Sequence, residues 1–345
     1  MMKAVILVGG EGTRLRPISL MMPKPVVPVL NVPMMFYILE WLKKHGVDEA
    51  IMVACYLPHI LNQVLKNSYK GMKIKYIYED APLGTGGAIK RAQPYMKGTT
   101  VVINGDVVTD FNITKMLKFH KESKSRATVG LYPVQNYSSF GVVDTGLNGS
   151  IKRFLEKPSR EEVGTEKAYI NAGIYLLEPE VLDIMEKGRK YSVERDVFPE
   201  FIGNGFFGFK QEYIYWLDMG TPERLRKFST DIMEGNYPLN LSENEKFLKE
   251  KGAKVLKPSL IGKGTKLRKN CVIGLLNVIG KKCEIGENSV LENCILFDDV
   301  KVGKDCTLKN TIICSGTEIK DNVRLTENSV LGPCSKITQY SKSGA

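Results

Sequence analysis

The chain has 345 residues, of which 43% are hydrophobic and 25% charged, a composition typical of a globular protein long enough for two domains. The formal net charge is +11, but lysine and arginine are spread along the chain without a compact basic run interleaved with aromatic residues, which argues against nucleic-acid binding. No apolar stretch approaches the roughly 20 residues that span a bilayer, and the N-terminal sequence lacks the features of a signal peptide. We therefore expect a soluble, cytoplasmic protein that binds neither nucleic acid nor a membrane.

The first two thirds of the chain alternate short β-branched runs with helical patterns. Strands are predicted at Lys3–Val8, Glu49–Ala54, Lys73–Tyr78, Thr100–Ile103, Ala127–Tyr132 and Tyr169–Leu177, and helices at Met34–Lys44, Pro58–Lys66 and Gly86–Tyr95. This alternation predicts an α/β domain with a Rossmann-like, mostly parallel sheet. In such sheets ligands bind beyond the carboxyl ends of the strands. Three candidate sites follow directly on predicted strands and can converge there: a glycine loop, Glu79 and the turn Asn104–Gly105–Asp106.

The loop GGEGTRLRPISLMMPKPVVP, residues 9–28, follows the first predicted strand and has the composition of a phosphate-binding segment. Its backbone amides can approach a ligand and form an anion-binding nest at three glycines, Gly9, Gly10 and Gly12. Arg14 is suited to stabilise charge on a phosphoryl group, and Lys24 is a point charge between two prolines that stiffen its backbone. The loop is therefore predicted to bind phosphates.

Two common nucleotide-binding motifs do not fit this loop. The Rossmann fingerprint fails because Leu15 stands at its third glycine position and no acidic residue closes the second strand, where Cys55 and Tyr56 are found. The P-loop motif fails because no Gly-Lys-Ser/Thr follows. A glycine turn with a purely structural role would not explain Arg14 and Lys24.

From Val255 the pattern changes to a six-residue repeat. Aliphatic residues recur at Val255, Ile261, Leu267, Ile273, Ile279, Ile285 and Leu291, then after a five-residue step at Leu296, Val302 and Leu308, and after another at Ile313, Ile319, Leu325, Leu331 and Ile337. This hexapeptide repeat predicts a β-helix with three short strands per coil, stabilised by stacking of the coils. The predicted domains are an α/β domain at residues 1–235, a linker at 236–254 and a β-helix at 255–340.

Six of the seven cysteines fall in the last quarter of the chain, and none forms a C-x-x-C pair. Cys271, Cys283 and Cys306 each stand two residues before an inward aliphatic residue, which favours small buried side chains between coils over a metal or redox site. The three histidines, His45, His59 and His120, belong to no motif and are expected at surface or boundary positions. The repeat contains no histidine, which argues against a second, acetyltransferase activity that uses a histidine base.

The loop at residues 9–28 resembles the signature of the sugar-1-phosphate nucleotidylyltransferases, the NDP-sugar pyrophosphorylases. Further motifs match in order along the first domain: PLGTGGA at Pro82–Ala88, NGDV at Asn104–Val107, FGVV at Phe140–Val143, EKP at Glu156–Pro158, NAGIY at Asn171–Tyr175 and WLDMGTPE at Trp216–Glu223. The tail resembles the left-handed β-helix appended to many members, so the resemblance covers nearly the whole chain. One departure is Ile18–Ser19, where the family usually has an aliphatic residue and threonine.

The resemblance implies roles for individual residues. Catalysis would fall to Arg14, Lys24 and Asp106, and Mg²⁺ would be held by Asp106 and Asp218, since Mg²⁺ prefers carboxylates together with substrate phosphates. The implied nucleotide-binding residues are Gly9, Gly10, Gly12, Thr13, Glu79, Gly84, Thr85, Gly86 and Gly105. The implied sugar-phosphate-binding residues are Gly141, Glu156, Lys157 and Asn171.

The reaction implied is attack of a sugar 1-phosphate on the α-phosphate of an NTP with release of pyrophosphate. Likeness to the guanylyltransferase branch, together with a carboxylate at Glu79 that could accept from guanine N1 and N2, favours GTP and mannose 1-phosphate. Glucose 1-phosphate with UTP, dTTP or ATP is the alternative, and a non-catalytic regulatory subunit of the same architecture is an alternative of another class. The β-helix is expected to assemble subunits into a homo-oligomer or to regulate the enzyme.

Overall fold

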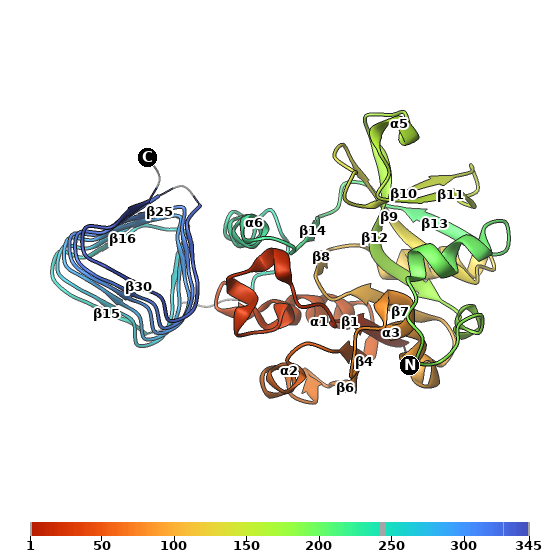
Figure 1. Cartoon of the computed structure of the whole chain (residues 1–345), viewed down its shortest axis with the longest axis horizontal. Helices are drawn as coiled ribbons and strands as arrows, with labels where there is room; N and C mark the ends of the chain where they lie inside the picture. The colour runs from red at the N-terminus through yellow and green to blue at the C-terminus, as the bar shows by residue number, and fades with distance from the viewer. Residues whose placement is uncertain (1, 242–245, 327, 344–345) are drawn as a thin grey trace. The chain divides into compact units, whose positions relative to one another are not determined.

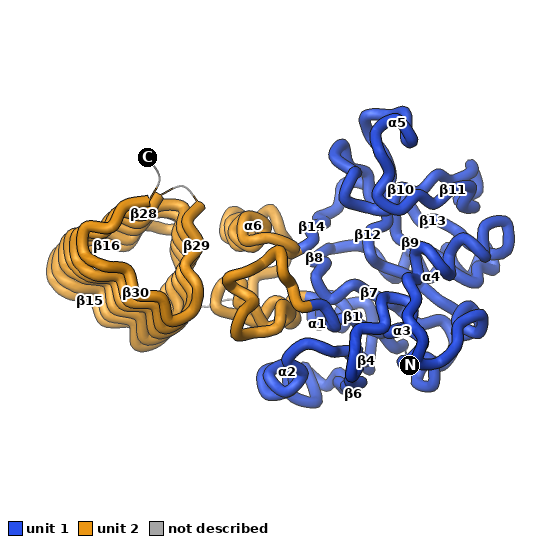
Figure 2. Tube along the Cα trace, viewed as in Figure 1, with its two compact units in different colours: residues 1–10, 38–218 blue, residues 11–37, 219–345 orange. Residues whose placement is uncertain are grey.

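The computed structural model describes residues 2–241, 246–326 and 328–343. Contacts divide the chain into two compact units, Met1–Gly10 with Ile38–Asp218 (unit 1) and Glu11–Tyr37 with Met219–Ala345 (unit 2), coloured in Figure 2. The segment Glu11–Tyr37 is therefore grouped with the C-terminal part of the chain. None of the helices in the described ranges is long and apolar enough to cross a membrane.

Unit 1 is built on a ten-stranded mixed sheet (Figure 1). Its strands are β1 (Met2–Leu7), β4 (Val47–Ala54), β5 (Ser68–Tyr69), β6 (Met72–Tyr78), β7 (Thr100–Asn104), β9 (Ala127–Val134), β10 (Gly141–Thr145), β11 (Ile151–Glu156), β12 (Ala168–Leu177) and β13 (Phe206–Lys210). Strand β1 pairs in parallel with β4 and β7, and β4 in parallel with β6, which confirms the predicted parallel sheet for the first four strands. Strand β12 then runs antiparallel to β7 and β9.

The first three helices of unit 1 lie where the sequence pattern predicts them. They are α1 (Met34–Lys44, which continues from unit 2), α2 (Pro58–Leu65), α3 (Gly84–Ala92), α4 (Ile113–Glu122) and α5 (Arg160–Val163), with short helical turns η4 (Gln93–Tyr95), η5 (Pro179–Leu182), η6 (Val193–Val197) and η7 (Phe198–Phe201). Ile89 of α3 packs with Val5 and Val102 of the central strands in the main core cluster. A separate two-stranded ribbon pairs β8 (Val107–Thr109) with β14 (Trp216–Asp218).

Unit 2 contains a β-helix of three parallel sheets, which Figure 1 shows as a stack of three-sided coils. Its strands are β15 (Leu248–Lys249), β16 (Lys254–Val255), β17 (Ser259–Ile261), β18 (Lys266–Leu267), β19 (Val272–Ile273), β20 (Asn277–Ile279), β21 (Glu284–Ile285), β22 (Val290–Glu292), β23 (Ile295–Leu296), β24 (Lys301–Val302), β25 (Thr307–Lys309), β26 (Ile312–Ile313), β27 (Glu318–Ile319), β28 (Arg324–Leu325), β29 (Val330–Leu331), β30 (Lys336–Ile337) and β31 (Lys342–Ser343). Every aliphatic residue of the predicted repeat belongs to one core cluster or packs against it. The stack begins at β15, inside the segment predicted as a linker, of which residues 242–245 lie outside the described residues.

The two five-residue steps in the repeat shorten the coils that contain them. Lys266 pairs with Glu284 eighteen residues later, whereas Glu284 pairs with Lys301, and Lys301 with Glu318, after seventeen. The parallel ladder therefore stays in register, because each coil omits one residue at a corner rather than in a strand.

Cys271, Cys283 and Cys306 are small buried residues between coils, as predicted, and Cys294 and Cys314 are buried too, whereas Cys334 is exposed. Cys283, Cys294 and Cys306 are at most 1% exposed, and each thiol donates to a backbone carbonyl fourteen residues later in the next coil, at 3.1, 3.2 and 3.2 Å. Burial raises the pKa of the Cys283 thiol to about 12. These thiols are neutral groups that link one coil to the next.

One outer face of the β-helix is apolar and covered by the chain's own segments. Strand alternation points Leu260, Val278, Ile295 and Ile312 away from the interior, yet they are 6%, 2%, 3% and 1% exposed. The other elements of unit 2 are η1 (Thr13–Leu15), η2 (Ile18–Leu20), η3 (Lys24–Val26), the hairpin β2 (Pro28–Val29) and β3 (Val32–Pro33), and helix α6 (Pro222–Met233).

Two side chains attach these elements to the coils. Asn31, in the hairpin turn, donates from Nδ2 to the carbonyl of Ile279 at 2.8 Å. Arg226 of α6 donates to the carbonyl of Asn310 and to the side chain of Asn328. The apolar face is therefore an internal contact of unit 2.

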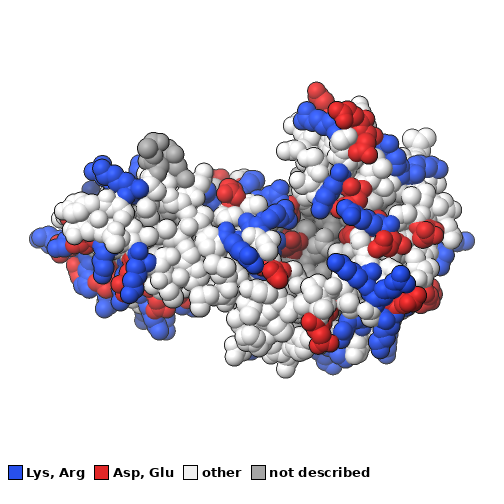
Figure 3. Space-filling model, in the orientation of Figure 1, with Lys and Arg blue, Asp and Glu red and all other residues white. Residues whose placement is uncertain are grey.

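The sheet of the β-helix that contains Lys266 has a different outer surface. Its outer positions carry alternating charges, such as Lys301 and Glu318, with Nζ and Oε1 3.6 Å apart. Lys and Arg are interspersed with Asp and Glu over the face shown in Figure 3, as the spread of lysine and arginine along the sequence suggests.

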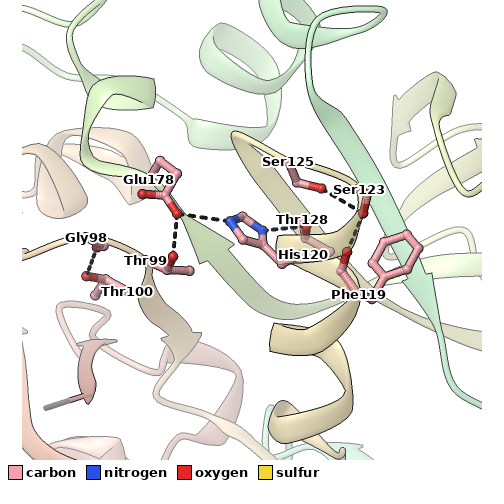
Figure 4. Close-up of polar contacts among 9 residues, drawn as sticks. All are labelled: Gly98, Thr99, Thr100, Phe119, His120, Ser123, Ser125, Thr128 and Glu178. Atoms are coloured by element: carbon pink, nitrogen blue, oxygen red, sulfur yellow. Dashed lines mark hydrogen bonds and ion pairs between the residues drawn. The ribbon is translucent and has the colours of Figure 1, made fainter.

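The prediction that His120 lies at the surface or at a boundary is wrong, because its side chain is only 2% exposed. Its ring lies between Thr128 Oγ1, 2.7 Å from Nδ1, and Glu178 Oε1, 3.2 Å from Nε2, and Thr99 also donates to Glu178 (Figure 4). The position is buried because α4 packs on β9 and β12, and the ring's two nitrogens are satisfied there. His45 is half-buried and His59 is exposed.

This histidine makes stability depend on pH. Burial lowers the pKa of His120 below its ordinary value of 6.5, with the carboxylate of Glu178 acting in the opposite direction. The unfolded chain therefore binds more protons here, so the stabilisation is complete above pH 6.5 and is lost as pH falls through the lowered pKa. We expect the free energy of unfolding to fall more steeply between about pH 7 and pH 5 in the parent than in His120→Gln, measured by urea denaturation. His59→Gln is the control and should keep the parent's pH slope; an unchanged slope in His120→Gln would contradict the assignment.

Candidate active site

The beginning of the glycine loop lies against the ends of β4 and β6. A Cβ atom on Gly9 would be 3.2 Å from Glu79 Oε2 and 3.7 Å from Cys55 Cβ, so only glycine leaves the Glu79 carboxylate its present position. The Glu79 amide donates to the Ala54 carbonyl at 2.8 Å, which fixes its backbone to the end of β4. Gly10 has no neighbour within 4 Å of a built Cβ and faces open space. Gly9, Gly10 and Glu79 thus meet at one sheet edge, as predicted.

Glu79 is buried, and one of its carboxylate oxygens can still accept a hydrogen bond. The residue is 7% exposed, and its Oε1 has no hydrogen-bond partner among the described residues. Burial raises the pKa of Glu79, while the charge of Arg91 and a bond from the Leu83 backbone oppose the shift. An unpaired buried carboxylate oxygen is costly in free energy unless a ligand donates to it, so this atom points to a donor-bearing ligand.

Within unit 2 the rest of the loop folds back on itself. Gly12 has φ +64°, a left-handed conformation that favours glycine, and a Cβ there would be 3.5 Å from Lys24 Cβ. Ser19 Oγ donates to the Gly12 carbonyl at 2.8 Å. Ser19 stands where the family usually has threonine, and its hydroxyl therefore links the two ends of this loop segment. Thr13 and Arg14 are exposed on η1, and Lys24 is half-buried on η3.

The two aspartates predicted to bind metal come from distant parts of the sequence, and the backbone pairing of β8 with β14 brings Asp218 beside the turn that carries Asp106. Asp218 ends β14 and pairs with Val107 of β8, the residue that follows Asp106. Gly105 anchors this turn, since its amide donates to the Leu7 carbonyl at 2.9 Å and a Cβ there would lie 2.7 Å from that oxygen. Asp218 is 8% exposed and Asp106 is half-buried. Aspartate carboxylates are ligands of the kind that suits Mg²⁺, which commonly takes one or two carboxylates and completes its shell with phosphates and water.

The PLGTGGA glycines pack tightly against a neighbouring segment. A Cβ on Gly84 would lie 2.4 Å from the Tyr191 carbonyl oxygen, and one on Gly86 would lie 2.8 Å from Tyr191 Cβ. The Gly86 amide also donates to the Tyr191 carbonyl at 2.9 Å. Close approach of this segment to the N-terminus of α3 is by itself sufficient to require glycine. The role of Gly84, Thr85 and Gly86 beside the base stays a prediction.

The predicted sugar-phosphate residues gather on β10, β11 and β12. Gly141 pairs with Glu156, and a Cβ on Gly141 would be 3.0 Å from Glu156 Oε2. Lys157 has φ +54°, and its Nζ is 3.9 Å from Glu156 Oε1. Burial first, and then the charge of Glu194, raise the pKa of Glu156, with Lys157 opposing.

Strand β12 joins this region to the turn that carries Asp106. Gly173 has φ +71°, and a Cβ there would lie 2.7 Å from Asn104 Nδ2. The register between β12 and β9 shifts from Asn171 to Tyr175, so the strand bulges at the NAGIY motif. Asn171 is therefore set on a bulged strand whose Gly173 lies against Asn104, the residue that begins the NGDV motif.

Two residues at this place were not identified from the sequence. Tyr175 is wholly buried and bonds to both Asn171 and Glu194, and Glu194 also accepts from Thr85 and Ser192. Tyr175 closes the NAGIY motif, which was a usable signal. Glu194 lies on the five-residue π-helical turn η6, whose pattern is not visible in hydrophobic periodicity.

Comparison with known families agrees with this geometry. A family profile described as "Nucleotidyl transferase" matches residues 3–235, more than half of the chain. The chain belongs to the nucleotidyl transferase family. A second profile, described as "EIF2B subunit epsilon LbH domain", matches residues 240–342 and agrees with the hexapeptide β-helix.

Several curated relatives resemble this chain. The mannose-1-phosphate guanylyltransferase of Mycobacterium tuberculosis is 37% identical over 240 residues, 68% of this chain and 66% of the relative. The UTP–glucose-1-phosphate uridylyltransferase of Synechocystis is 36% identical over 237 residues, 64% of this chain and 60% of the relative. The mannose-1-phosphate guanylyltransferase catalytic subunit beta of Dictyostelium discoideum is 36% identical over 338 residues, 96% of this chain and 91% of the relative. The chain thus spans less than two thirds of the length of the first two relatives and nearly all of the third.

Among solved structures, HddC from Yersinia pseudotuberculosis is similar to part of this chain. It covers 67% of this chain and 100% of its own, with a TM-score of 0.58 and 29% identity. A second structure of that protein, complexed with GMP-PN, has the same TM-score and 30% identity. The likeness shows that this part of the chain shares its fold with a solved structure.

The packing of the PLGTGGA segment predicts a sharp response to one added methyl group. Gly84 has φ +71° and no room for a Cβ beside the Tyr191 carbonyl, so Gly84→Ala should destabilise the protein by several kcal/mol or displace the 189–194 segment. Gly98 has φ +71° as well but open space around its Cβ, so Gly98→Ala should lose only about 1 kcal/mol. Thermal unfolding of both variants tests the difference, and equal losses would contradict a packing role for Gly84.

Proposed function

We propose that this protein transfers a nucleotidyl group from GTP to mannose 1-phosphate, forming GDP-mannose and releasing pyrophosphate. The observation that carries a metal-assisted nucleotidyl transfer is the pairing of β8 with β14, which brings Asp218 beside the Asp106 turn. The preference for guanine is supported by the unpaired, buried oxygen of Glu79. Relatives named mannose-1-phosphate guanylyltransferase, at 37% and 36% identity, support this choice, while the uridylyltransferase at 36% keeps glucose 1-phosphate with UTP as the alternative.

The reaction needs positioning and charge neutralisation rather than a covalent intermediate. An oxygen of the sugar 1-phosphate attacks the α-phosphorus of the NTP, a new P–O bond forms, and the bond to the β-phosphate oxygen breaks so that pyrophosphate leaves with the electron pair. Arg14 and Lys24 are proposed to bind the triphosphate and to stabilise charge on the transferring and leaving groups. Lys157 is proposed to bind the sugar phosphate, and Gly141, Glu156 and Asn171 the sugar.

Asp106 and Asp218 are the residues proposed to hold Mg²⁺. When bound there, Mg²⁺ would neutralise phosphate charge as a Lewis acid. The chain's own contribution is to present the two carboxylates from a rigid backbone ladder, with Gly105 holding the turn against β1. Asp218 is buried, so its carboxylate is kept out of bulk water. Electrostatic interactions of a buried carboxylate are stronger than those of one in solvent.

Glu79 is proposed to read the base. A carboxylate accepts only, and guanine offers adjacent donors at N1 and N2, whereas the adenine edge offers an acceptor at N1. The alternative substrates, glucose 1-phosphate with UTP, dTTP or ATP, are to be distinguished by assay. We further propose that the enzyme is cytoplasmic and assembles as a homo-oligomer through β-helix faces other than the apolar face that its own chain covers.

Pyrophosphate release tests the reaction directly. With Mg²⁺ present, four NTPs are each combined with mannose 1-phosphate and with glucose 1-phosphate, and GTP with mannose 1-phosphate should give the highest kcat/KM. Turnover only with glucose 1-phosphate and another NTP would refute the substrate assignment, and no turnover with any pair would refute the activity.

The carboxylate pair predicts a loss of activity without a loss of fold. Asp106→Asn and Asp218→Asn should each lower kcat on the order of 100-fold or more, because each removes a charged ligand from the metal and its phosphates. Asp183→Asn, at an exposed position, is the control and should retain full activity. Circular dichroism checks that the variants fold, and full activity in either site variant would exclude the proposed metal site.

Glu79 predicts a base-specific effect. Glu79→Gln should raise KM for GTP roughly 10- to 100-fold. The carboxylate offers two acceptors to the donors at guanine N1 and N2, whereas the amide offers one acceptor and places a donor against the other guanine donor. The preference of the variant for GTP over the other NTPs should be smaller than that of the parent, while KM for mannose 1-phosphate changes little. Asp80→Asn, at the exposed neighbouring position, serves as the control. An unchanged ratio of kcat/KM values between GTP and ATP would contradict base recognition by Glu79.

A further inference from the structure

A chain of hydrogen bonds in unit 1 joins the PLGTGGA segment to the NAGIY strand. Thr85 Oγ1 donates to Glu194 Oε2 at 2.7 Å, the Tyr175 hydroxyl donates to Glu194 Oε1 at 3.3 Å, and Asn171 Nδ2 donates to the Tyr175 hydroxyl at 2.8 Å. We infer that Glu194 is a positioning residue, which fixes the orientation of the Asn171 amide and thereby the sugar selectivity of the site. The inference rests on the proposed function, because Asn171 is the residue proposed to bind the sugar.

The direction of every bond in this chain follows from Glu194. A carboxylate has acceptors only, so the hydroxyls that reach it must donate their single hydrogen to it. The Tyr175 oxygen is left with acceptor capacity alone, and its partner on Asn171 must therefore be the amide nitrogen rather than the carbonyl oxygen. Because Tyr175 is wholly buried, water does not offer it another arrangement.

The other end of the Asn171 amide agrees with this orientation. Its Oδ1 accepts from the Gly173 amide at 2.9 Å, on the bulge of β12. One hydrogen on Nδ2 and one lone pair on Oδ1 remain for a ligand. A single donor beside a single acceptor matches a sugar hydroxyl, which both donates and accepts, and a rotated amide would exchange the two positions.

Glu194 is itself held on several sides. Ser192 Oγ donates to its Oε2 at 2.7 Å, and the Val193 amide donates to Thr85 Oγ1 at 3.0 Å, which orients the Thr85 hydrogen toward the carboxylate. The carboxylate also lies close enough to Glu156 for its charge to raise the pKa of that proposed sugar ligand. Glu194 thus influences two residues of the sugar side, Asn171 through hydrogen bonds and Glu156 through charge.

The experiment compares full-length Glu194→Gln with the parent, using mannose 1-phosphate and its C2 epimer glucose 1-phosphate as probes. The side-chain amide introduced by this substitution can donate to the Tyr175 oxygen, which frees the Tyr175 hydrogen from the carboxylate and leaves the Gly173 amide as the remaining group that orients Asn171. We expect KM for mannose 1-phosphate to rise roughly tenfold and the preference between the two sugars to shrink, with KM for the NTP changed less than about threefold.

A second variant separates positioning from a merely structural role. Tyr175→Phe breaks the same chain one link further on, so it should raise KM for the sugar phosphate similarly, and the double variant should be no worse than the single ones. Glu200→Gln, at an exposed position on η7, is the matched control. A lower melting temperature with unchanged KM values and sugar preference, or additive effects in the double variant, would overturn the inference.

Failure of the proposed function is recognised separately. If the parent turns over no NTP with either sugar phosphate, the reaction is refuted, and the inference is then read from binding of mannose 1-phosphate by calorimetry. Weaker binding in Glu194→Gln and Tyr175→Phe but not in Glu200→Gln would support the inference even so. Absence of binding to the parent, or equal binding in all variants, would overturn it.

Discussion

The antiparallel pairing of β8 with β14 is the constraint on which the candidate site depends. It sets Asp218 opposite Val107, although the two residues are far apart in the sequence. The register is held outside the ladder as well, because Thr109 Oγ1 donates to the Tyr215 carbonyl at 2.8 Å and the Tyr215 amide donates to Asp110 Oδ1 at 2.8 Å. A slip by one residue would turn Asp218 to the other side of the ribbon, since side chains alternate along a strand. The backbone position of Asp218 beside the Asp106 turn is therefore fixed by this ladder.

The three faces of the β-helix are built from one repeat but differ on their outer sides. All three point an aliphatic residue inward, but the sheet of β17, β20, β23 and β26 is apolar on its outer side as well. That side is buried within unit 2, where Asn31 and Arg226 bond to the coil backbone. The tail is therefore part of the unit that contains Lys24, in addition to any role in assembly.

Prediction from sequence was most accurate where structure is set by local periodicity. The first four strands, the helix Met34–Lys44 and the inward residues of the β-helix were all placed correctly, and even the shortened coils follow from the five-residue steps. It was least accurate for isolated polar residues. His120 was taken as a surface or boundary residue, yet the packing of α4 against the sheet buries it, and a lone histidine has no periodic neighbour to reveal this.

The same distinction applies to the site. Ordered motifs in the sequence selected Gly9, Asp106, Asp218 and Asn171, and Glu79 was selected by its place at the end of a predicted strand, where a sheet edge collects ligands. Sequence did not select Glu194, since its contacts to Thr85 and Tyr175 join segments separated along the chain and its π-helical turn has no repeat.

By itself the sequence determined the α/β domain, the β-helix and the kinds of side chain available for binding phosphates, since these depend on spacing along the chain. Only the tertiary structure decided which distant aspartates come together along the backbone, which acceptor is buried without a partner among the described residues and which residues bond to Asn171. Those properties depend on strand register and on exclusion of water, and neither exists until distant segments have packed.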